Sequence, residues 1–185
     1  EERQRGLHRW RCLDDGLRLH GHRYSLRVRY GLCSLAHWPD VVGPDADVPY
    51  NQLGDYTAPQ ADGVVITPLA GIIAEVGSFK VRYAKGCAVR DVKSADIPSA
   101  VAAARACDVV VAVVGGSSAR DFRTEYISTG AASVSNDSVS DMDCGEGFDR
   151  ASLDLLGRQM DLLKALKATG KPLVVVYIQG RPLDM

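Results

Sequence analysis

The chain has 185 residues, an apolar fraction of 46% and a formal net charge of -1 at pH 7. This length is sufficient for one domain with a hydrophobic core. A near-neutral charge gives no broad basic surface for nucleic acid or an anionic membrane, and no apolar run reaches the roughly 18 residues of a membrane span. We therefore expect neither a nucleic-acid partner nor a membrane partner.

Residues 1–40 differ in composition from the rest of the chain. They hold eight arginines and all four histidines, whereas the first lysine is Lys80. Alternation at Tyr24, Leu26 and Val28 resembles a strand, but convincing turn and cap residues are missing around it. Two interpretations stay open, a basic arm for an acidic partner and non-native sequence such as a frame error. We set residues 1–40 apart as atypical and expect 41–185 to be part of one domain of a longer protein.

The cysteines and the acidic stretch DMDCGE give little support for a metal centre. The five cysteines are odd in number and lack C-x-x-C spacing, which argues against a zinc site or a disulfide framework. DMDCGE resembles an incomplete calcium loop without the glutamate at the twelfth position or flanking helices. We expect reduced structural cysteines, no metal and no cofactor.

Strand and helix signals alternate from Val41 onward. VVG reads as the end of a strand and is followed by a loop. Thr67 can cap a helix that has Pro68 at its first position and ends at Gly77. FKVRYAKG then reads as a short alternating strand.

The second half repeats the alternation. Asp96 and Pro98 mark the start of an alanine-rich helix, and DVVVAVVGG reads as a strand buried on both faces. RQMDLLKALKATG has helical periodicity and ends at Gly170, and KPLVVVYIQG reads as a second buried strand. This order predicts an α/β fold, an open and mostly parallel sheet with helices on both faces in a three-layer sandwich that is incomplete here.

A long loop separates Gly115 from the helix that starts near Gly157. Loops of such length are uncommon in compact domains and are usually functional or disordered. This one carries eight acidic residues and follows the carboxyl end of a predicted parallel strand, where α/β sheets bind ligands. It could bind a sugar, hold a metal or supply a general acid. GGSSARD lacks the spacing of a phosphate-binding loop.

Glu146 stands between Gly145 and Gly147, which permit unusual backbone angles and close approach of a ligand. Spacing alone somewhat favours an ordinary solvated side chain at Glu146. Arg150 has Asp149 and Asp154 as candidate partners.

Seven segments in order resemble one known family: VGPDAD, QLGDYTAP, YAKGC, VVVAVVGGSS, GEGFDR, LLGRQMDLLKAL and TGKPLVVVYIQGRPL. Together they are similar to the second, α/β-sandwich domain of glycoside hydrolase family 3, which contains β-glucosidases and β-xylosidases. The resemblance covers about Val41 to Met185 and leaves residues 1–40 unmatched.

The resemblance implies retaining hydrolysis by two carboxylates. It places the general acid/base on Glu146, with Asp149 and Arg150 orienting the loop and Glu125 as the second choice of proton donor. The family's nucleophile is an aspartate of a preceding TIM-like barrel, which this chain does not contain. Asp141, although it follows a serine, therefore receives no nucleophilic role.

We expect part of an exo-acting β-glucosidase-like enzyme that is inactive without a barrel in cis. Its substrates would be β-linked oligosaccharides or aryl glycosides, and the family makes a periplasmic or secreted location an expectation. Alternatives are a β-xylosidase of the same family, a non-catalytic carbohydrate- or nucleotide-binding module, and the product of a degraded gene.

Overall fold

A computed structural model provides the structure of the chain. It describes residues 38–54, 56–57, 60–118, 128–129, 141–145 and 149–184, and the backbone alone of 18–19, 22–23, 125–126 and 132–133. The chain divides into two units, Glu1–Ser34 and Leu35–Met185. In the first unit, β1 (Arg18–Leu19) pairs antiparallel with β2 (His22–Arg23).

The second unit is built on a parallel four-stranded sheet with the order β4-β3-β5-β8. Its strands are β3 (Pro39–Val42), β4 (Arg82–Ala84), β5 (Val109–Gly115) and β8 (Leu173–Ile178). The helices α1 (Pro68–Val76), α2 (Ile97–Arg105) and α3 (Gln159–Lys167) connect successive strands. The predicted α/β fold with an open parallel sheet is confirmed.

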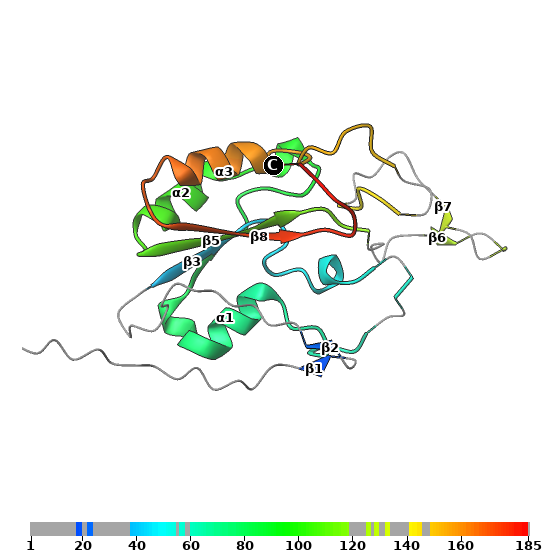
Figure 1. The fold of residues 1–185 in the computed structure, drawn as a ribbon, viewed down its shortest axis with the longest axis horizontal. Helices are drawn as coiled ribbons and strands as arrows, with labels where there is room; N and C mark the ends of the chain where they lie inside the picture. The colour runs from blue at the N-terminus through cyan, green and yellow to red at the C-terminus, as the bar shows by residue number, and fades with distance from the viewer. Residues whose placement is uncertain are drawn as a thin grey trace, which may run out of the picture. The chain divides into compact units, whose positions relative to one another are not determined.

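Helices cover both faces of this sheet (Figure 1). Alternate residues of β5 belong to two separate apolar clusters, because successive side chains of a strand point to opposite faces. Val110, Ala112 and Val114 pack on the face that also carries Ala100 of α2 and Leu162 of α3. On the other face, β5 and β3 pack against Leu69 of α1. The three-layer arrangement follows from this alternation.

The cap residues act as the sequence predicts. The Thr67 hydroxyl accepts a hydrogen bond from the Ala70 N–H at 3.1 Å, and the Asp96 carboxylate accepts one from the Ser99 N–H at 3.2 Å. Each satisfies a backbone donor that the first turn of a helix leaves without a partner. Helix α1 ends at Gly77, which has φ +91°.

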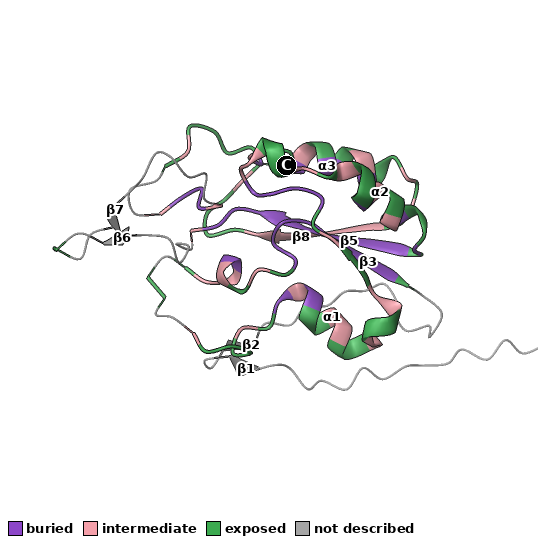
Figure 2. Cartoon of the chain, turned by 180° about the vertical axis from the view of Figure 1, so that it is seen from behind, coloured by how far each residue is buried: buried purple, intermediate pink, exposed green. Residues whose placement is uncertain are grey.

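β8 differs from the prediction of a second fully buried strand. Every residue of β5 is buried, whereas every residue of β8 is partly exposed (Figure 2). The reason is position, since β5 lies between two strands and β8 lies at the edge of the described sheet.

Shorter elements complete the described chain. Three 3-10 helices are η1 (Pro49–Gln52), η2 (Ser78–Lys80) and η3 (Val92–Ser94). Within the long loop, β6 (Glu125–Tyr126) pairs antiparallel with β7 (Ala132–Ser133). Among the described residues, no helix is long and apolar enough to cross a membrane.

Candidate functional site

The site starts where β5 leaves the sheet. Gly115 has φ +146°, and a Cβ atom there would lie 1.8 Å from the Ile178 carbonyl oxygen. The Gly116 N–H donates to that same carbonyl at 3.0 Å. Only glycine at position 115 lets the chain turn this close to β8. The residues that follow are thereby held at the carboxyl edge of the sheet.

Asp143 is joined to this strand end by two hydrogen bonds. Its carboxylate accepts from the Ser117 N–H at 2.9 Å, and its own N–H donates to the Ser117 carbonyl at 2.8 Å. A Cβ atom at Gly116 would lie 2.3 Å from the Asp143 carboxylate, so the absence of a side chain there makes room for the contact. Asp143 is therefore fixed through both its main chain and its side chain.

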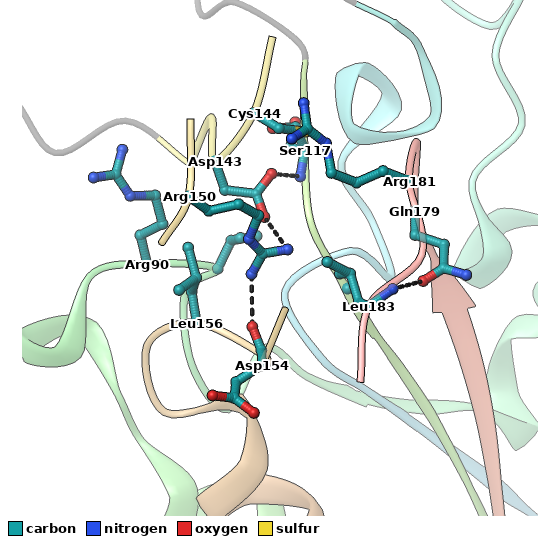
Figure 3. Close-up of polar contacts among 12 residues, drawn as sticks. Arg90, Ser117, Asp143, Cys144, Arg150, Asp154, Leu156, Gln179, Arg181 and Leu183 are labelled. Atoms are coloured by element: carbon teal, nitrogen blue, oxygen red, sulfur yellow. Dashed lines mark hydrogen bonds and ion pairs between the residues drawn. The ribbon is translucent and has the colours of Figure 1, made fainter. Parts of the chain in front are cut away.

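Arg150 meets the same carboxylate from the far end of the acidic stretch (Figure 3). Its Nη1 lies 3.3 Å from Oδ2 of Asp143, and the two side chains are 3% and 0% exposed. This contact brings opposite charges together without hydrogen-bond geometry, and the Arg150 Nε also has no acceptor among the described residues. Nη2 donates to the Asp154 carbonyl at 2.6 Å. The guanidinium thus bridges Asp143 and the segment that leads to α3.

Residues 141–142 are joined to the segment after β4. The Asp141 carboxylate accepts a hydrogen bond from the Val89 N–H at 3.1 Å, and Arg90 donates to the Met142 carbonyl at 2.8 Å. Lys85 lies 3.9 Å from Asp141, partly exposed. The acidic stretch therefore contacts the chain beyond β4 as well as the chain beyond β5. Asp141 makes structural contacts here, and its exclusion as a nucleophile stays a prediction.

Gln159 supports the strand end from the start of α3. It is fully buried, and its side-chain carbonyl accepts from the Gly115 N–H at 2.8 Å. Its amide donates to the carbonyls of Gly115 at 2.8 Å and Val89 at 3.1 Å. One buried amide thus satisfies backbone groups at the end of β5 and in the segment after β4.

Asp149 lies on the exposed side of the same region. Its carboxylate accepts from the Arg150 N–H at 2.8 Å and from the Arg181 guanidinium at 3.1 Å. The backbone hydrogen bond and the Arg181 charge hold the pKa of Asp149 below its usual value. Arg181, in the segment after β8, thus contacts Asp149.

Asp45 follows β3 at this edge. Burial is the main cause that raises its pKa to about 7, and the charges of Asp141 and Asp143 add to the increase. A hydrogen bond from the Asn51 amide, 2.7 Å long, acts in the opposite direction.

The structure locates some of the predicted site residues. Asp149 and Arg150 lie at the carboxyl edge. Arg150 pairs with Asp143 and the Asp154 carbonyl, whereas the Asp149 carboxylate accepts from the Arg150 backbone N–H and from the Arg181 guanidinium. For Glu125 the backbone alone is described, in β6. Glu146 lies outside the described residues, and the acid/base assignment stays a prediction.

Asp143 and Gln159 are the residues that sequence reasoning missed. No periodicity or motif separates Asp143 from the other acids of the loop, and Gln159 looks like an ordinary polar residue in the first turn of a helix. Among the residues that the structure describes, no three His, Cys, Asp or Glu side chains form a group that could hold a metal ion.

Comparisons with known proteins agree with this architecture. Residues 40–185 match the model of the glycosyl hydrolase family 3 C-terminal domain. The chain is 36% identical over 152 residues to a β-xylosidase of Formosa agariphila and 35% identical over 166 residues to a periplasmic β-glucosidase of Salmonella typhimurium. These alignments cover 78% of this chain but only 18% and 19% of those proteins.

Solved structures show the same similarity. A β-glucosidase involved in saponin metabolism from intestinal bacteria superposes with a TM-score of 0.60 and 28% identity, over 80% of this chain and 21% of that one. The exo-β-xylosidase XlnD superposes with a TM-score of 0.56 and 26% identity, over 77% of this chain and 15% of that one. The parallel sheet, its helices and the sequence match together place the chain in glycoside hydrolase family 3, as part of the family's C-terminal domain.

Proposed function

We propose that this chain contributes the general acid/base to a retaining, exo-acting β-glycosidase, with Glu146 as the proton donor. In such a mechanism a carboxylic acid first protonates the departing glycosidic oxygen, and the resulting carboxylate then activates water. The second carboxylate, the nucleophile, would come from a TIM-like barrel domain outside this chain. By itself this chain is then inactive.

The observation that carries the proposal is the position of residues 143 and 150. Asp143 is hydrogen-bonded to Ser117, directly after β5, and Arg150 pairs with Asp143. The segment that contains Glu146 therefore begins and ends at the carboxyl edge of a parallel sheet, the edge at which α/β folds bind their ligands. Family membership supports hydrolysis as the reaction, because the relatives include a β-xylosidase and a β-glucosidase.

The substrate class follows from the relatives. We propose a terminal β-linked glucoside as the sugar, since one relative is a periplasmic β-glucosidase. A β-xyloside is the second candidate, and the similarity to the Formosa β-xylosidase favours it. Activity of the intact enzyme on matched aryl glucoside and aryl xyloside substrates decides between them. The periplasmic relative also supports a periplasmic or secreted location, which fractionation of the source cells would test.

The test of the acid/base assignment is Glu146→Ala in the full-length enzyme. Turnover of substrates with poor leaving groups should fall by about 100-fold or more, because those leaving groups need a proton. Activated aryl glycosides should lose much less at the first step, and added azide should restore their turnover by replacing water in the second step. An equal loss on both substrate classes, without azide rescue, would remove Glu146 from this role.

Glu125→Gln is the matched variant for this test. It removes the carboxyl group of the second candidate proton donor and keeps the size of the side chain. If Glu125→Gln, and not Glu146→Ala, produces the leaving-group dependence and the azide rescue, the proton donor is Glu125. A loss with neither variant would favour a non-catalytic binding module.

A further inference from the structure

The geometry points to the buried ion pair of Asp143 and Arg150 as the device that positions the acid/base segment for catalysis. Both are positioning residues, since the pair acts through the residues between them and needs no contact with the sugar. The inference rests on the proposed function, and its test separates the two.

The Asp143 end is the more rigid of the two. Hydrogen bonds of 2.8 and 2.9 Å join its main chain and its carboxylate to Ser117. Ser117 follows Gly115, whose N–H and carbonyl are both held by the buried Gln159 side chain at 2.8 Å. The position of Asp143 is thus set by the end of β5 and the start of α3, two of the best-packed elements of the domain.

Arg150 ties the other end of segment 144–149 to Asp143. Its guanidinium lies 3.3 Å from the Asp143 carboxylate and donates at 2.6 Å to the Asp154 carbonyl. The planar guanidinium can reach two acceptors at once, which a lysine ammonium on a flexible stem does less well. The side chain is only 3% exposed, so water screens the attraction little.

The ion pair of Asp143 and Arg150 can act on the residues between them because these are few. Six residues, 144–149, separate the two partners in the sequence, and Glu146 is the third of them. In general, a loop of this length held at both ends has fewer accessible backbone arrangements than one held at a single end. Releasing either end would increase the range of positions of the proton donor, and misplacement by about 1 Å can cost on the order of 100-fold in rate.

A purely structural ion pair is the alternative, and it predicts different data. Such a pair would change the stability of the domain and lower the activity on every substrate in the same proportion. A positioning pair changes the dependence of rate on the leaving group, because only the proton transfer suffers. The dependence of kcat/KM on leaving-group acidity is therefore the decisive measurement.

The experiment uses the full-length enzyme with Arg150→Gln, Arg150→Lys and the double variant Asp143→Asn/Arg150→Gln. The double variant removes both charges and leaves no unpaired buried ion, so it keeps the test valid if Arg150→Gln fails to fold. Arg158→Gln is the matched control, since Arg158 pairs with Asp161 at 2.6 Å on the exposed surface of α3. Thermal unfolding, kcat and KM are measured for each protein on activated and poorly activated aryl glycosides.

We expect Arg150→Gln and the double variant to lose about 10- to 100-fold in kcat on poorly activated glycosides. On activated ones the loss should be about threefold or less, with KM nearly unchanged. Arg150→Lys should lie between these and the parent, and Arg158→Gln should match the parent. Losses of equal size on both substrate classes would overturn the inference and leave a structural pair.

A double-variant cycle with Glu146→Ala separates the two proposals. If the pair acts through Glu146, Arg150→Gln should cause almost no further loss in the Glu146→Ala background on poorly activated glycosides. Independent, multiplicative losses would overturn the positioning role while leaving the acid/base assignment intact. Failure of Glu146→Ala alone in the azide test overturns the proposed function, whatever Arg150 does.

Discussion

Two buried aspartates, at opposite ends of the same sheet, have very different surroundings. Asp143, at the carboxyl edge, receives the Ser117 N–H and the Arg150 guanidinium. Asp40, in β3, is equally inaccessible, but neither of its carboxylate oxygens has a hydrogen-bond partner among the residues that the structure describes. Burial raises the pKa of Asp40 to about 7, and the charge of Arg82 opposes that rise only in part.

The contrast shows that burial of a carboxylate can have opposite effects on stability, depending on its surroundings. At the carboxyl edge the polar groups of several segments converge, because every strand of a parallel sheet ends there and leaves backbone donors to be satisfied. Within β3 the neighbouring backbone groups are already used in the ladder, and the side chain faces an apolar layer. A buried acid is therefore an organising group in the first region and a destabilising one in the second.

The largest effect should come from breaking the paired aspartate. Arg150→Met leaves the Asp143 charge buried with the Ser117 N–H as its remaining partner, and we expect a loss of about 3–5 kcal/mol in the free energy of unfolding of the domain. Urea denaturation of the intact protein, followed in this domain, measures it. Replacing both residues should cost less than Arg150→Met alone, and a greater loss in the double variant would contradict this account.

Removal of the Gln159 amide should rank next. Gln159→Leu keeps a similar volume but leaves the N–H and the carbonyl of Gly115 buried without their side-chain partner. We expect a loss of about 2–3 kcal/mol by the same denaturation measurement. Gln159→Glu supplies a control, because it retains the acceptor for the Gly115 N–H and loses the amide donor. It should keep the contact with the Gly115 N–H and disturb the contacts with the carbonyls of Gly115 and Val89.

Replacing Asp40 should raise the free energy of unfolding, in contrast to the two preceding variants. Asp40→Val replaces a buried carboxyl, which has no hydrogen-bond partner in the described part of the chain, with a strand-forming apolar side chain of similar size. We expect a gain of about 1–3 kcal/mol at pH 7. Destabilisation by Asp40→Val would mean that the carboxyl has a favourable partner in the intact protein.

Asp40 also predicts a pH dependence. Its pKa is about 7 in the folded chain and near 3.8 when unfolded, so the folded state binds the proton more tightly. The contribution of this group to stability is complete below pH about 4 and is lost progressively as the pH rises to about 7. The difference in unfolding free energy between the parent and Asp40→Val should grow over this range, and a constant difference would refute the pKa shift.

The smallest effect belongs to the exposed pair of Arg158 and Asp161. Their side chains are 45% and 52% exposed, so water screens the attraction. Arg158→Gln should change the unfolding free energy by about 0.5 kcal/mol or less. A change as large as that of Arg150→Met would show that burial is not what distinguishes the two ion pairs.

Asp40 is also the last residue of the atypical segment 1–40. β3 begins at Pro39, so two of its four residues fall in the part that we set apart on composition. Non-native sequence before Val41, which stays a hypothesis, would account for a buried acid that has no hydrogen-bond partner among the described residues of the chain. The native gene would then encode an apolar residue at position 40, and an uninterrupted frame with aspartate there would refute the hypothesis.

Local signals predicted much of the fold. Thr67, Asp96 and the apolar run of β5 each act through neighbours within a few residues or through burial on both faces, which a sequence pattern records directly. The exposure of β8 was not predictable from its apolar run, because the run of an edge strand and that of a central strand look alike.

The site was predictable only in outline. Residues 149 and 150 were named as orienting groups from the resemblance, and both lie at the carboxyl edge. The partner of Arg150 was not predictable, since Asp143, Asp149 and Asp154 all lie within a turn or two of it in the sequence.

By itself, the sequence determined the alternation of strand and helix, the family and the loop that holds Glu146, because periodicity, caps and ordered motifs are local properties of the chain. Only the tertiary structure decided which acid Arg150 neutralises, that Gln159 supports the end of β5, and that Asp40 is buried with no hydrogen-bond partner among the described residues. Each of these depends on segments some 7 to 70 residues apart meeting in a solvent-free layer, and no local pattern encodes such a meeting.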